Sequence, residues 1–344
     1  MRILIINFIF FSLTTIFLPR CMKQSQLSET EKMQQFFAKD RVNILITDSG
    51  LGGLSVFADL AERIRSAGIF KTVNLIYFNA QPHMKSGYNS MKTTDQKIRV
   101  LENALSAMET NFEPDLLLIA CNTLSVLYPE TQYARRANIP VVGIVGTGVD
   151  LISEKIKNEK DASVIIFATK TTVEKDAHRQ ILRERGYDTS RFITQACPKL
   201  AGSIERGIQS EETKDLVDIY VNEALQKFNP GTEPFLVSLN CTHYGYVSDL
   251  FKQSFEKHGY TPAEMLDPNP FMVNFIFDDY FHRRYTESVL NLKVVSQSEL
   301  PDDHIKSIGA LIALTSPATH DALKKYKFTP ELFEWRSITG DTGE

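Results

Sequence analysis

The stretch ILITDSGLGGLSVF, residues 44–57, joins an apolar run to a glycine-rich turn and then to apolar residues at helical spacing. A continuous apolar run is typical of a strand that is buried on both faces of a parallel sheet. Asp48 and Ser49 stand at its carboxyl end, where such sheets bind ligands. We expect the glycines to let a small ligand approach these side chains and the nearby amide groups closely.

This turn is an incomplete dinucleotide-binding motif. Gly50, Gly52 and Gly53 fit only part of GxGxxG, because Ser55 stands at the last position. The next predicted strand ends in Asn79 instead of the acidic residue that would bind a ribose. The carboxylate of Asp48 would also repel a pyrophosphate, so the pattern disfavours a dinucleotide site.

The composition is that of a globular protein whose 344 residues suffice for two domains. The formal net charge of -4 and the lack of a long basic cluster argue against a nucleic-acid partner. Cys21, Cys121, Cys197 and Cys241 lie far apart without a CxxC pair, and HExxH is absent. We therefore expect neither a metal site nor a disulfide framework.

The remaining pattern alternates strands and helices. Strands are predicted at 41–47 and 73–79 and within 114–123, 139–146, 162–170, 191–198 and 234–244. Helices are predicted at 54–65, 93–110, 173–185 and 213–228, and the apolar segment 304–316 is either a strand or a buried helix. Such alternation predicts an α/β fold with a mostly parallel sheet and helices on both faces.

Two cysteines stand where predicted strands end. Cys121 is followed by Asn122 and Thr123, and Cys241 is followed by Thr242 and His243. The surrounding segments LLIACNTLSVLY and LVSLNCTHYGYV echo each other weakly, which suggests two related α/β halves that each present one thiol. A lone buried cysteine is usually a small apolar residue. Strand-end amides and a helix N-terminus can nevertheless activate a thiol, and a neighbouring histidine can exchange protons with it.

Two thiols that face each other across a substrate indicate racemisation without a cofactor. One thiol would remove a proton from one face of a carbon atom, and the other would deliver a proton to the opposite face. Because the carbon acid is weak, such a site must stabilise a developing carbanion and exclude water.

At this point the sequence resembles the glutamate racemase family, within the aspartate/glutamate racemase superfamily. DSGLGGLSV resembles the opening motif of that family, and ACNTLS and CTHY resemble its two cysteine motifs. ATKTTV and ACPKLAGSIE resemble the intervening segments, and the likeness covers roughly residues 42–266. It implies two pseudo-symmetric, doubly wound parallel-sheet domains with the active site between them, and no cofactor or metal.

The resemblance also implies roles for residues and boundaries for domains. Cys121 would act on the D-enantiomer and Cys241 on the L-enantiomer, with Asp48 and His243 assisting. The expected substrate-binding residues are Ser49, Asn122, Thr123, Thr242 and, in support of the second half, Glu205. The first domain would comprise residues 41–145 and 262–344 and the second residues 146–261, since the C-terminal segment of the family returns to the first domain.

A substrate-facing loop departs from the family pattern. The usual acidic residue after the second strand is replaced by Ala80, a Pro-Tyr-Gly segment by Lys85, Ser86 and Gly87, and a Glu-Pro pair by Gly146 and Thr147. We keep Lys85, Ser86 and Gly87 as candidate substrate-binding residues. Lys85 would pair with a side-chain carboxylate as a point charge, or else be a solvated surface lysine.

The first residues are unlike the rest. Residues 1–21 carry Arg2, a mostly apolar run and Cys21, and a polar segment, residues 22–40, is predicted to be a linker. The run is shorter than the ~20 residues of a spanning helix but suits a signal peptide or lipoprotein-like leader. We expect a periplasmic or other envelope location, with or without a membrane anchor at Cys21. A cytoplasmic chain with a misplaced start codon is the alternative.

The leading hypothesis is a cofactor-independent racemase of glutamate, which would supply or remodel peptidoglycan. A racemase of another acidic amino acid such as aspartate is an alternative, as is an envelope protein that binds an amino acid without turnover. A small-molecule amino acid is the expected partner, and a homodimer is the expected assembly. The sequence shows no interface for that dimer.

Overall fold

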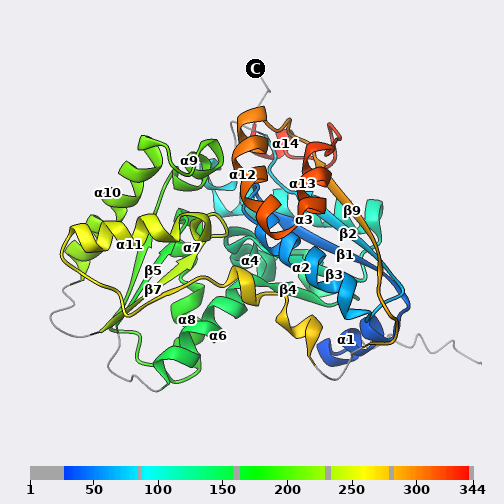
Figure 1. Cartoon of the computed structure of the whole chain (residues 1–344), viewed down its shortest axis with the longest axis horizontal. Helices are drawn as coiled ribbons and strands as arrows, with labels where there is room; N and C mark the ends of the chain where they lie inside the picture. Colours follow the sequence, from blue (N-terminus) through cyan, green and yellow to red (C-terminus); the bar gives the residue numbers. More distant parts are fainter. Residues whose placement is uncertain (1–26, 84–86, 158–162, 229–233, 279–282, 341–344) are drawn as a thin grey trace, which may run out of the picture.

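The computed structural model describes residues 27–83, 87–157, 163–228, 234–278 and 283–340. The chain forms two lobes, each built on one sheet (Figure 1). The predicted leader, residues 1–21, lies outside the described residues. Within the described ranges, no helix combines the length and the apolar character needed to cross a bilayer.

The first lobe is built on a six-stranded sheet with the order β10-β9-β2-β1-β3-β4. Every pairing in it is parallel, and Asp48 and Asn79 are partners at the carboxyl ends of β1 and β2. The strands are β1 (Arg41–Asp48), β2 (Thr72–Asn79), β3 (Leu116–Ile119), β4 (Val141–Gly143), β9 (Val289–Ser296) and β10 (Lys327–Phe328).

Helices cover both faces of this sheet because successive β1 side chains point to opposite sides. Ile44 and Ile46 pack in a cluster with α2, α12 and α13, whereas Leu45 packs with α3 and α4 on the other face. The helices of the first lobe are α1 (Glu29–Ala38), α2 (Leu54–Ala67), α3 (Thr94–Phe112), α4 (Asn122–Leu127), α5 (Gln132–Arg136), α12 (Asp302–Thr315), α13 (Pro317–Lys324) and α14 (Arg336–Thr339).

The second lobe is built on a four-stranded, wholly parallel sheet with the order β6-β5-β7-β8. Its strands are β5 (Ser163–Ala168), β6 (Phe192–Ala196), β7 (Phe235–Asn240) and β8 (Glu264–Leu266). Ile165 and Phe167 pack toward α10 and α11, and Val164 and Ile166 toward α6 and α8. The helices are α6 (Ile144–Ile156), α7 (Lys170–Lys175), α8 (Ala177–Glu184), α9 (Leu200–Arg206), α10 (Glu211–Lys227) and α11 (Ser248–Lys257).

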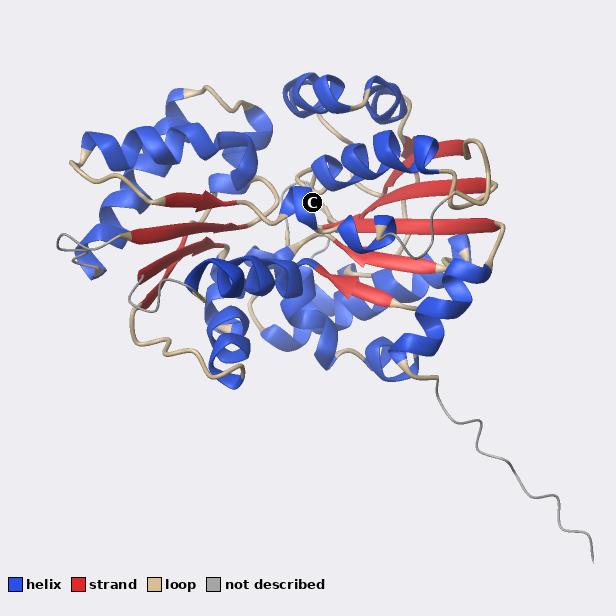
Figure 2. Ribbon diagram, turned by 60° about the horizontal axis from the view of Figure 1, so that its bottom comes forward, coloured by secondary structure: helices blue, strands red, loops and turns tan. Residues whose placement is uncertain are grey.

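Short 3-10 turns complete the described chain, and several of them lie beside the region where the lobes meet. They are η1 (Tyr88–Ser90), η2 (Tyr128–Glu130), η3 (Tyr244–Val247), η4 (Asn269–Phe271) and η5 (Asn274–Phe277). The two sheets lie next to each other with helices on both sides of each (Figure 2). The α/β fold with two doubly wound parallel sheets is therefore confirmed.

Helix α2 shows how the sequence produces one of these layers. Its apolar residues recur at helical spacing, and Leu54, Phe57 and Ile64 are completely buried. Burying one such side chain contributes about 1.5–3 kcal/mol relative to exposure. The helix ends at Gly68, whose φ of 60° is left-handed, and a Cβ there would lie 2.0 Å from the carbonyl oxygen of Tyr285. Glycine is needed at this position on both grounds.

The predicted linker, residues 22–40, is wrong where it is described, because residues 29–38 form α1. Ser28 and Glu31 make a reciprocal capping box at its start. Phe36 and Phe37 are buried against Phe70, with ring centroids 5.1 and 6.1 Å from it. The segment thus packs as part of the first lobe.

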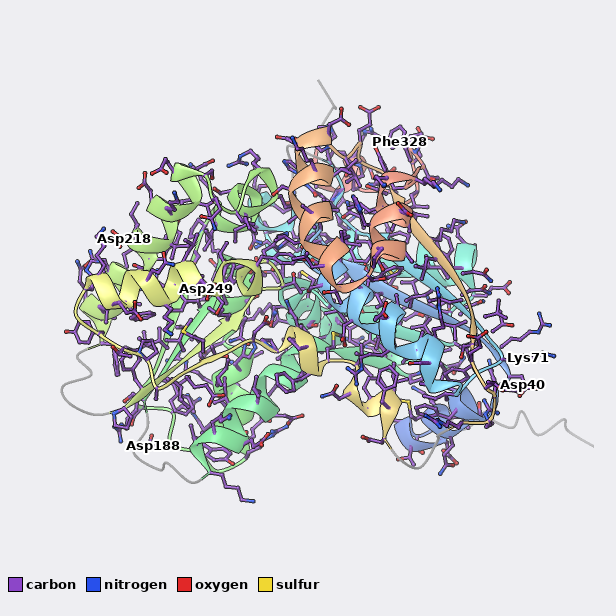
Figure 3. The ribbon with its side chains drawn as sticks, in the orientation of Figure 1. Asp40, Lys71, Asp188, Asp218, Asp249 and Phe328 are labelled. Atoms are coloured by element: carbon purple, nitrogen blue, oxygen red, sulfur yellow. The ribbon has the colours of Figure 1, made fainter. Side chains whose placement is uncertain are left out.

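Hydrogen bonds also join the segments that precede the strands of the first lobe, at the amino ends of β1 and β2. The amide of Lys71 donates to the carbonyl of Asp40 over 2.7 Å, and both residues lie at one end of the first lobe in Figure 3. Arg284 donates to the carbonyl oxygens of Lys39 and Ile69. The C-terminal segment, which returns to the first lobe, is therefore hydrogen-bonded to the segments that precede β1 and β2.

One predicted helix and one predicted boundary differ from the structure, and a third segment, left open by the sequence, is assigned by it. The helix predicted at 173–185 is two helices, α7 and α8, because Asp176 adopts a left-handed φ of 51° between them. Segment 304–316 is helical and lies mostly in α12. Strand β8 follows residue 261 but pairs with β7, so the second sheet extends beyond the predicted boundary. The domain division itself stays a prediction.

Candidate active site

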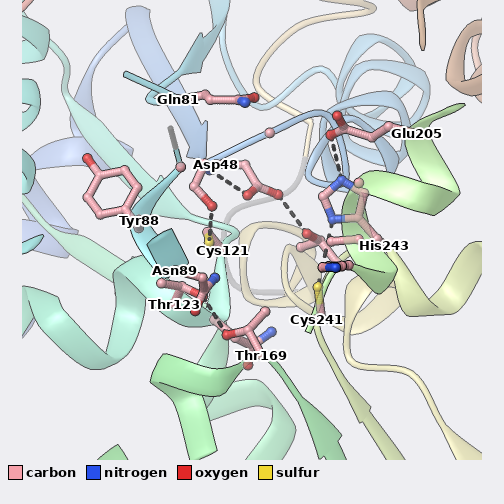
Figure 4. A pocket seen from close by; sticks show the side chains of 18 of the residues that line it. Asp48, Gln81, Tyr88, Asn89, Cys121, Thr123, Thr169, Glu205, Cys241 and His243 are labelled. Carbon is pink, nitrogen blue, oxygen red and sulfur yellow. Dashed lines mark hydrogen bonds and ion pairs between the residues drawn. The ribbon is translucent and has the colours of Figure 1, made fainter. Parts of the chain in front are cut away.

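A cavity of about 510 Å³ lies where the carboxyl ends of the two sheets meet. Asp48 ends β1, Cys121 follows β3, and Cys241 follows β7, and all three line this cavity. Figure 4 shows Cys121 and Cys241 entering it from different elements, with Asp48 nearby. One thiol therefore comes from each lobe. Both cysteines are free and buried.

The carboxylate of Asp48 organises the glycine-rich turn. It accepts hydrogen bonds from the amides of Ser49 (2.5 Å) and Gly53 (2.6 Å) and from the hydroxyl of Thr242 (2.7 Å). The first two bonds shape the connection between β1 and α2, and the third comes from the second lobe. A buried carboxylate with three donors is held in one orientation.

Cys121 is placed at the N-cap of α4, and its sulfur lies 3.1 Å from the hydroxyl oxygen of Ser49. Burial and the negative charge of Asp48 raise the pKa of the Cys121 thiol well above its ordinary value, against a smaller opposite effect of Ser49. In the substrate-free protein this thiol accordingly keeps its proton.

Cys241 has a different neighbourhood, because its sulfur lies 3.7 Å from Nδ1 of His243. The opposite nitrogen of that ring, Nε2, lies 2.7 Å from Oε1 of Glu205. Burial alone would lower the pKa of His243, but its hydrogen bonds with Cys241 and Glu205 and their charges raise it well above its ordinary value. The imidazole is therefore a proton-carrying group beside the second thiol.

Glu205 is ionised although it is buried. Burial would raise the pKa of this carboxyl, but hydrogen bonds from His243, His304 and the amide of Leu51 hold its pKa well below the usual range. Both oxygens already accept from protein groups. Glu205 consequently lies behind His243 as seen from Cys241, and it also lines the cavity.

Polar groups of the first lobe remain available inside the cavity. Both polar atoms of the Asn122 side chain are buried without a hydrogen-bond partner among the described residues. Thr123 pairs with Thr169 across the lobes, with 2.7 Å between the two hydroxyl oxygens. Buried amide groups normally find partners, so the bare amide of Asn122 is a natural binding group for a ligand.

The structure gathers nearly all of the predicted site residues. Those that line the cavity are Asp48, Ser49, Gly87, Cys121, Asn122, Thr123, Glu205, Cys241, Thr242 and His243. Lys85 and Ser86 lie outside the described residues, as does Cys21. The catalytic and binding roles assigned to these positions stay predictions.

Sequence reasoning missed several residues of the cavity wall. Thr169 and Lys170 follow β5, and their position at a strand end was a signal that could have found them. The others that it missed are Gln81, Tyr88, Asn89, Ser90, Pro198, Lys199, Ala201, Gly202 and Arg206. Cys197, to which we assigned no role from the sequence, also lines the cavity and is buried. In the described part of the chain, no cluster of three or more His, Cys, Asp or Glu side chains is arranged to hold a metal ion.

Comparison with known proteins identifies the relatives of this chain. Residues 44–272 match the Asp/Glu/Hydantoin racemase family. The glutamate racemase of Helicobacter pylori (strain Shi470) is 26% identical over 245 residues, covering 70% of this chain and 87% of that protein. The glutamate racemase of Aquifex pyrophilus is 28% identical over 213 residues, covering 62% and 75% respectively.

Solved structures share the same fold. The crystal structure of glutamate racemase from Campylobacter jejuni subsp. jejuni gives a TM-score of 0.57 at 23% identity, over 79% of this chain and 97% of that one. Glutamate racemase from Francisella tularensis subsp. tularensis SCHU S4, in complex with D-glutamate, gives 0.60 at 17% identity, over 79% and 94%. Both likenesses extend over the two lobes together.

Proposed function

Because this chain belongs to the Asp/Glu/Hydantoin racemase family, we propose that it is a cofactor-independent racemase that interconverts L- and D-glutamate. The observation that carries the proposal is the convergence of Cys121 and Cys241, one from each lobe, on a single cavity. Inversion at a carbon atom requires proton removal from one face and proton delivery to the other. Thiols from two separate sheets can meet that requirement.

The two thiols have environments that suit opposite tasks. Cys121 holds its proton in the free protein, since burial and Asp48 raise the pKa of its thiol. Cys241 has the imidazole of His243 beside it. For L-glutamate, the thiolate of Cys241 takes the Cα proton, and Cys121 gives its proton to the opposite face of the carbanion. The thiol–thiolate pair is thereby exchanged, and reaction of D-glutamate restores it.

The charges of the cavity favour an acidic amino acid. The two carboxylates in its wall, Asp48 and Glu205, are each occupied by protein donors. Lys170, Lys199 and Arg206 lie in the exposed part of the wall, where Lys170 also pairs with Glu174 and Arg206 with Glu212. Cationic groups of this kind attract a dianionic substrate and steer it inward. Asn122 offers its amide to the α-carboxylate or the amino group.

The biological setting is part of the same proposal. D-glutamate made by this chain would serve peptidoglycan synthesis if the chain acts in the cytoplasm, and turnover of D-amino acids if residues 1–21 direct it to the envelope. Cell fractionation separates the two settings, and mass analysis of residues around Cys21 tests for a lipid. Sedimentation of the purified chain tests the predicted homodimer.

The activity is tested by incubating the purified chain with single enantiomers of glutamate, aspartate and neutral amino acids. Chiral chromatography follows the appearance of the opposite enantiomer. We expect inversion of glutamate in both directions, with equal kcat/KM values because the equilibrium constant of a racemisation is one. Binding of glutamate without inversion or hydrogen exchange at Cα would instead select the amino-acid-binding alternative, and turnover of aspartate alone would select the other racemase.

A further inference from the structure

The carboxylate of Glu205 is shared by two histidines. Its Oε1 lies 2.7 Å from Nε2 of His243, and its Oε2 lies 3.2 Å from Nδ1 of His304. The amide of Leu51 also donates to Oε1 over 2.7 Å. All three side chains are buried, with 9% or less of each exposed. Glu205 and His243 stand beside the cavity in Figure 4.

His304 reaches this carboxylate from a remote part of the chain. It lies in the first turn of α12, in the C-terminal segment of the first lobe and beyond the residues that match the family. Glu205 lies on α9 of the second lobe, and α12 packs against α9. The contact between His304 and Glu205 therefore joins the lobes directly behind the second thiol.

The contacts form one continuous chain. His304 touches Glu205, Glu205 touches His243, and Nδ1 of His243 lies 3.7 Å from the sulfur of Cys241. A carboxylate with a donor on each oxygen has a fixed plane, whereas a carboxylate with one free, buried oxygen turns toward another partner or admits water. The position of the His243 ring thus depends on both ends of Glu205.

We propose that His304 is a positioning residue for proton transfer at Cys241: it holds the outer oxygen of Glu205 so that the inner oxygen fixes the imidazole of His243 against the thiol. This role deepens the proposed racemase activity and rests on it. His304 itself does not line the cavity. It acts on the reaction only through Glu205 and His243.

A purely structural role is the alternative, because His304 could simply pack α12 onto α9. Three variants separate the two roles. His304→Leu removes the donor and keeps the bulk, while His304→Asn keeps a donor near the position of Nδ1. His320→Leu is the matched control. His320 on α13 packs against Gly309 of α12, where a Cβ would lie 3.0 Å from its ring.

In the racemisation assay, we expect His304→Leu to lower kcat by about 10–100-fold, since displaced catalytic groups cost this much even when the substitution is remote. KM should stay within about twofold, because His304 does not line the cavity and its removal leaves every residue of the cavity wall in the chain. His304→Asn should recover most of kcat, and His320→Leu should leave kcat unchanged. Equal kcat values for wild type and His304→Leu, or no recovery in a folded His304→Asn chain, would overturn the proposal.

A second measurement does not depend on turnover. In the substrate-free full chain, the Nε2 proton of His243 is enclosed by Glu205, so we expect it to give a downfield, slowly exchanging NMR signal. That proton should exchange at least about tenfold faster in His304→Leu, and at close to the wild-type rate in His304→Asn and His320→Leu. An unchanged signal in His304→Leu contradicts the positioning role even if the chain proves not to racemise glutamate. If the wild-type chain does not racemise glutamate but the His243 proton exchanges in the four proteins as expected, only the proposed activity is contradicted.

Discussion

The hydroxyl of Thr242 donates a hydrogen bond to Oδ2 of Asp48 over 2.7 Å, although the two residues are 194 positions apart and belong to different lobes. The same carboxylate shapes the turn after β1 through the amides of Ser49 and Gly53. One bond therefore connects the turn that carries Asp48 with the segment that carries Cys241. Together with the contacts Thr123–Thr169 and Leu51–Glu205, it joins the lobes that carry the two thiols.

Replacing Thr242 by valine tests this connection. The substitution keeps the shape of the side chain but removes one of the two donors to Oδ2 of Asp48, and the amide of Gly53 remains. Loss of a hydrogen bond to a charged group costs about 1.5–3 kcal/mol. We expect kcat/KM for glutamate to fall at least tenfold, and thermal unfolding to occur at a lower temperature. Thr261→Val, at an exposed threonine, is the control. Wild-type kinetics in Thr242→Val would show that the bond between the lobes is dispensable.

Gly52 tests how closely the lobes approach each other. A Cβ on this residue would lie 2.4 Å from Oγ1 of Thr242 and 2.6 Å from Nδ1 of His243. Gly52→Ala must therefore displace the imidazole beside Cys241, and we expect kcat to fall by about 10–100-fold. Gly146→Ala is the matched control, since a Cβ there meets nothing within 4 Å. Similar kinetics for the two alanine variants would mean that Gly52 lies farther from Thr242 and His243 than the structure places it.

Glu205 provides a test that depends on pH. Hydrogen bonds from two histidines and the Leu51 amide outweigh burial and hold its pKa well below the usual range. A depressed carboxyl pKa contributes stability above the unfolded value of about 4.3, and that contribution is lost as the pH falls through the folded value. We expect Glu205→Gln to lower the free energy of unfolding by about 3 kcal/mol near pH 7, because it leaves a buried imidazole unpaired.

The deficit of Glu205→Gln should shrink as the pH falls below about 4, where the wild-type carboxyl begins to lose its own contribution. Urea unfolding of both proteins at several pH values measures the difference. Glu212→Gln, which alters an exposed pair with Arg206, should show no comparable pH dependence. A deficit that stays constant across this range would contradict the ionised, doubly paired state of Glu205.

Asp267 is expected to behave in the opposite way. Burial raises its pKa to about 6, against the opposing hydrogen bond from the amide of Asn269. Between about pH 4 and pH 6 the folded chain binds a proton that the unfolded chain has released, so stability falls as the pH rises through this window. Asp267→Asn should therefore stabilise the protein by roughly 1–2 kcal/mol at pH 8 and have little effect at pH 4. Thermal unfolding at both pH values provides the measurement, and destabilisation at pH 8 would contradict the raised pKa.

Much of the fold could be predicted because its core strands are nearly uninterrupted apolar runs. Strands β1 and β2 begin and end within one residue of their predicted bounds. The break between α7 and α8 could not be predicted. It depends on one residue, Asp176, which adopts a left-handed conformation although it is not a glycine. Helix α1 was missed because its burial depends on Phe70, which lies more than thirty residues away along the chain.

In the candidate site, too, some residues could be predicted from the sequence and others depend on contacts between distant segments. Asp48, Cys121 and Cys241 were recognisable because each stands at the end of an apolar strand, and parallel strands bring such ends together. The place of Glu205 behind His243 was not recognisable, since it depends on how α9 meets η3. His304 was beyond sequence reasoning for the same reason. It contributes through a contact between helices that are about a hundred residues apart.

The central claim is that one thiol from each lobe serves each face of one carbon atom. L-glutamate turned over in deuterium oxide tests it most directly, with proton NMR of both enantiomers at early times. We predict D-glutamate with one deuterium at Cα and recovered L-glutamate that still carries its proton, and a loss of at least about 10³-fold in inversion for Cys121→Ala and for Cys241→Ala. Inversion at the wild-type rate by either alanine variant, or equal early labelling of both enantiomers, would contradict it.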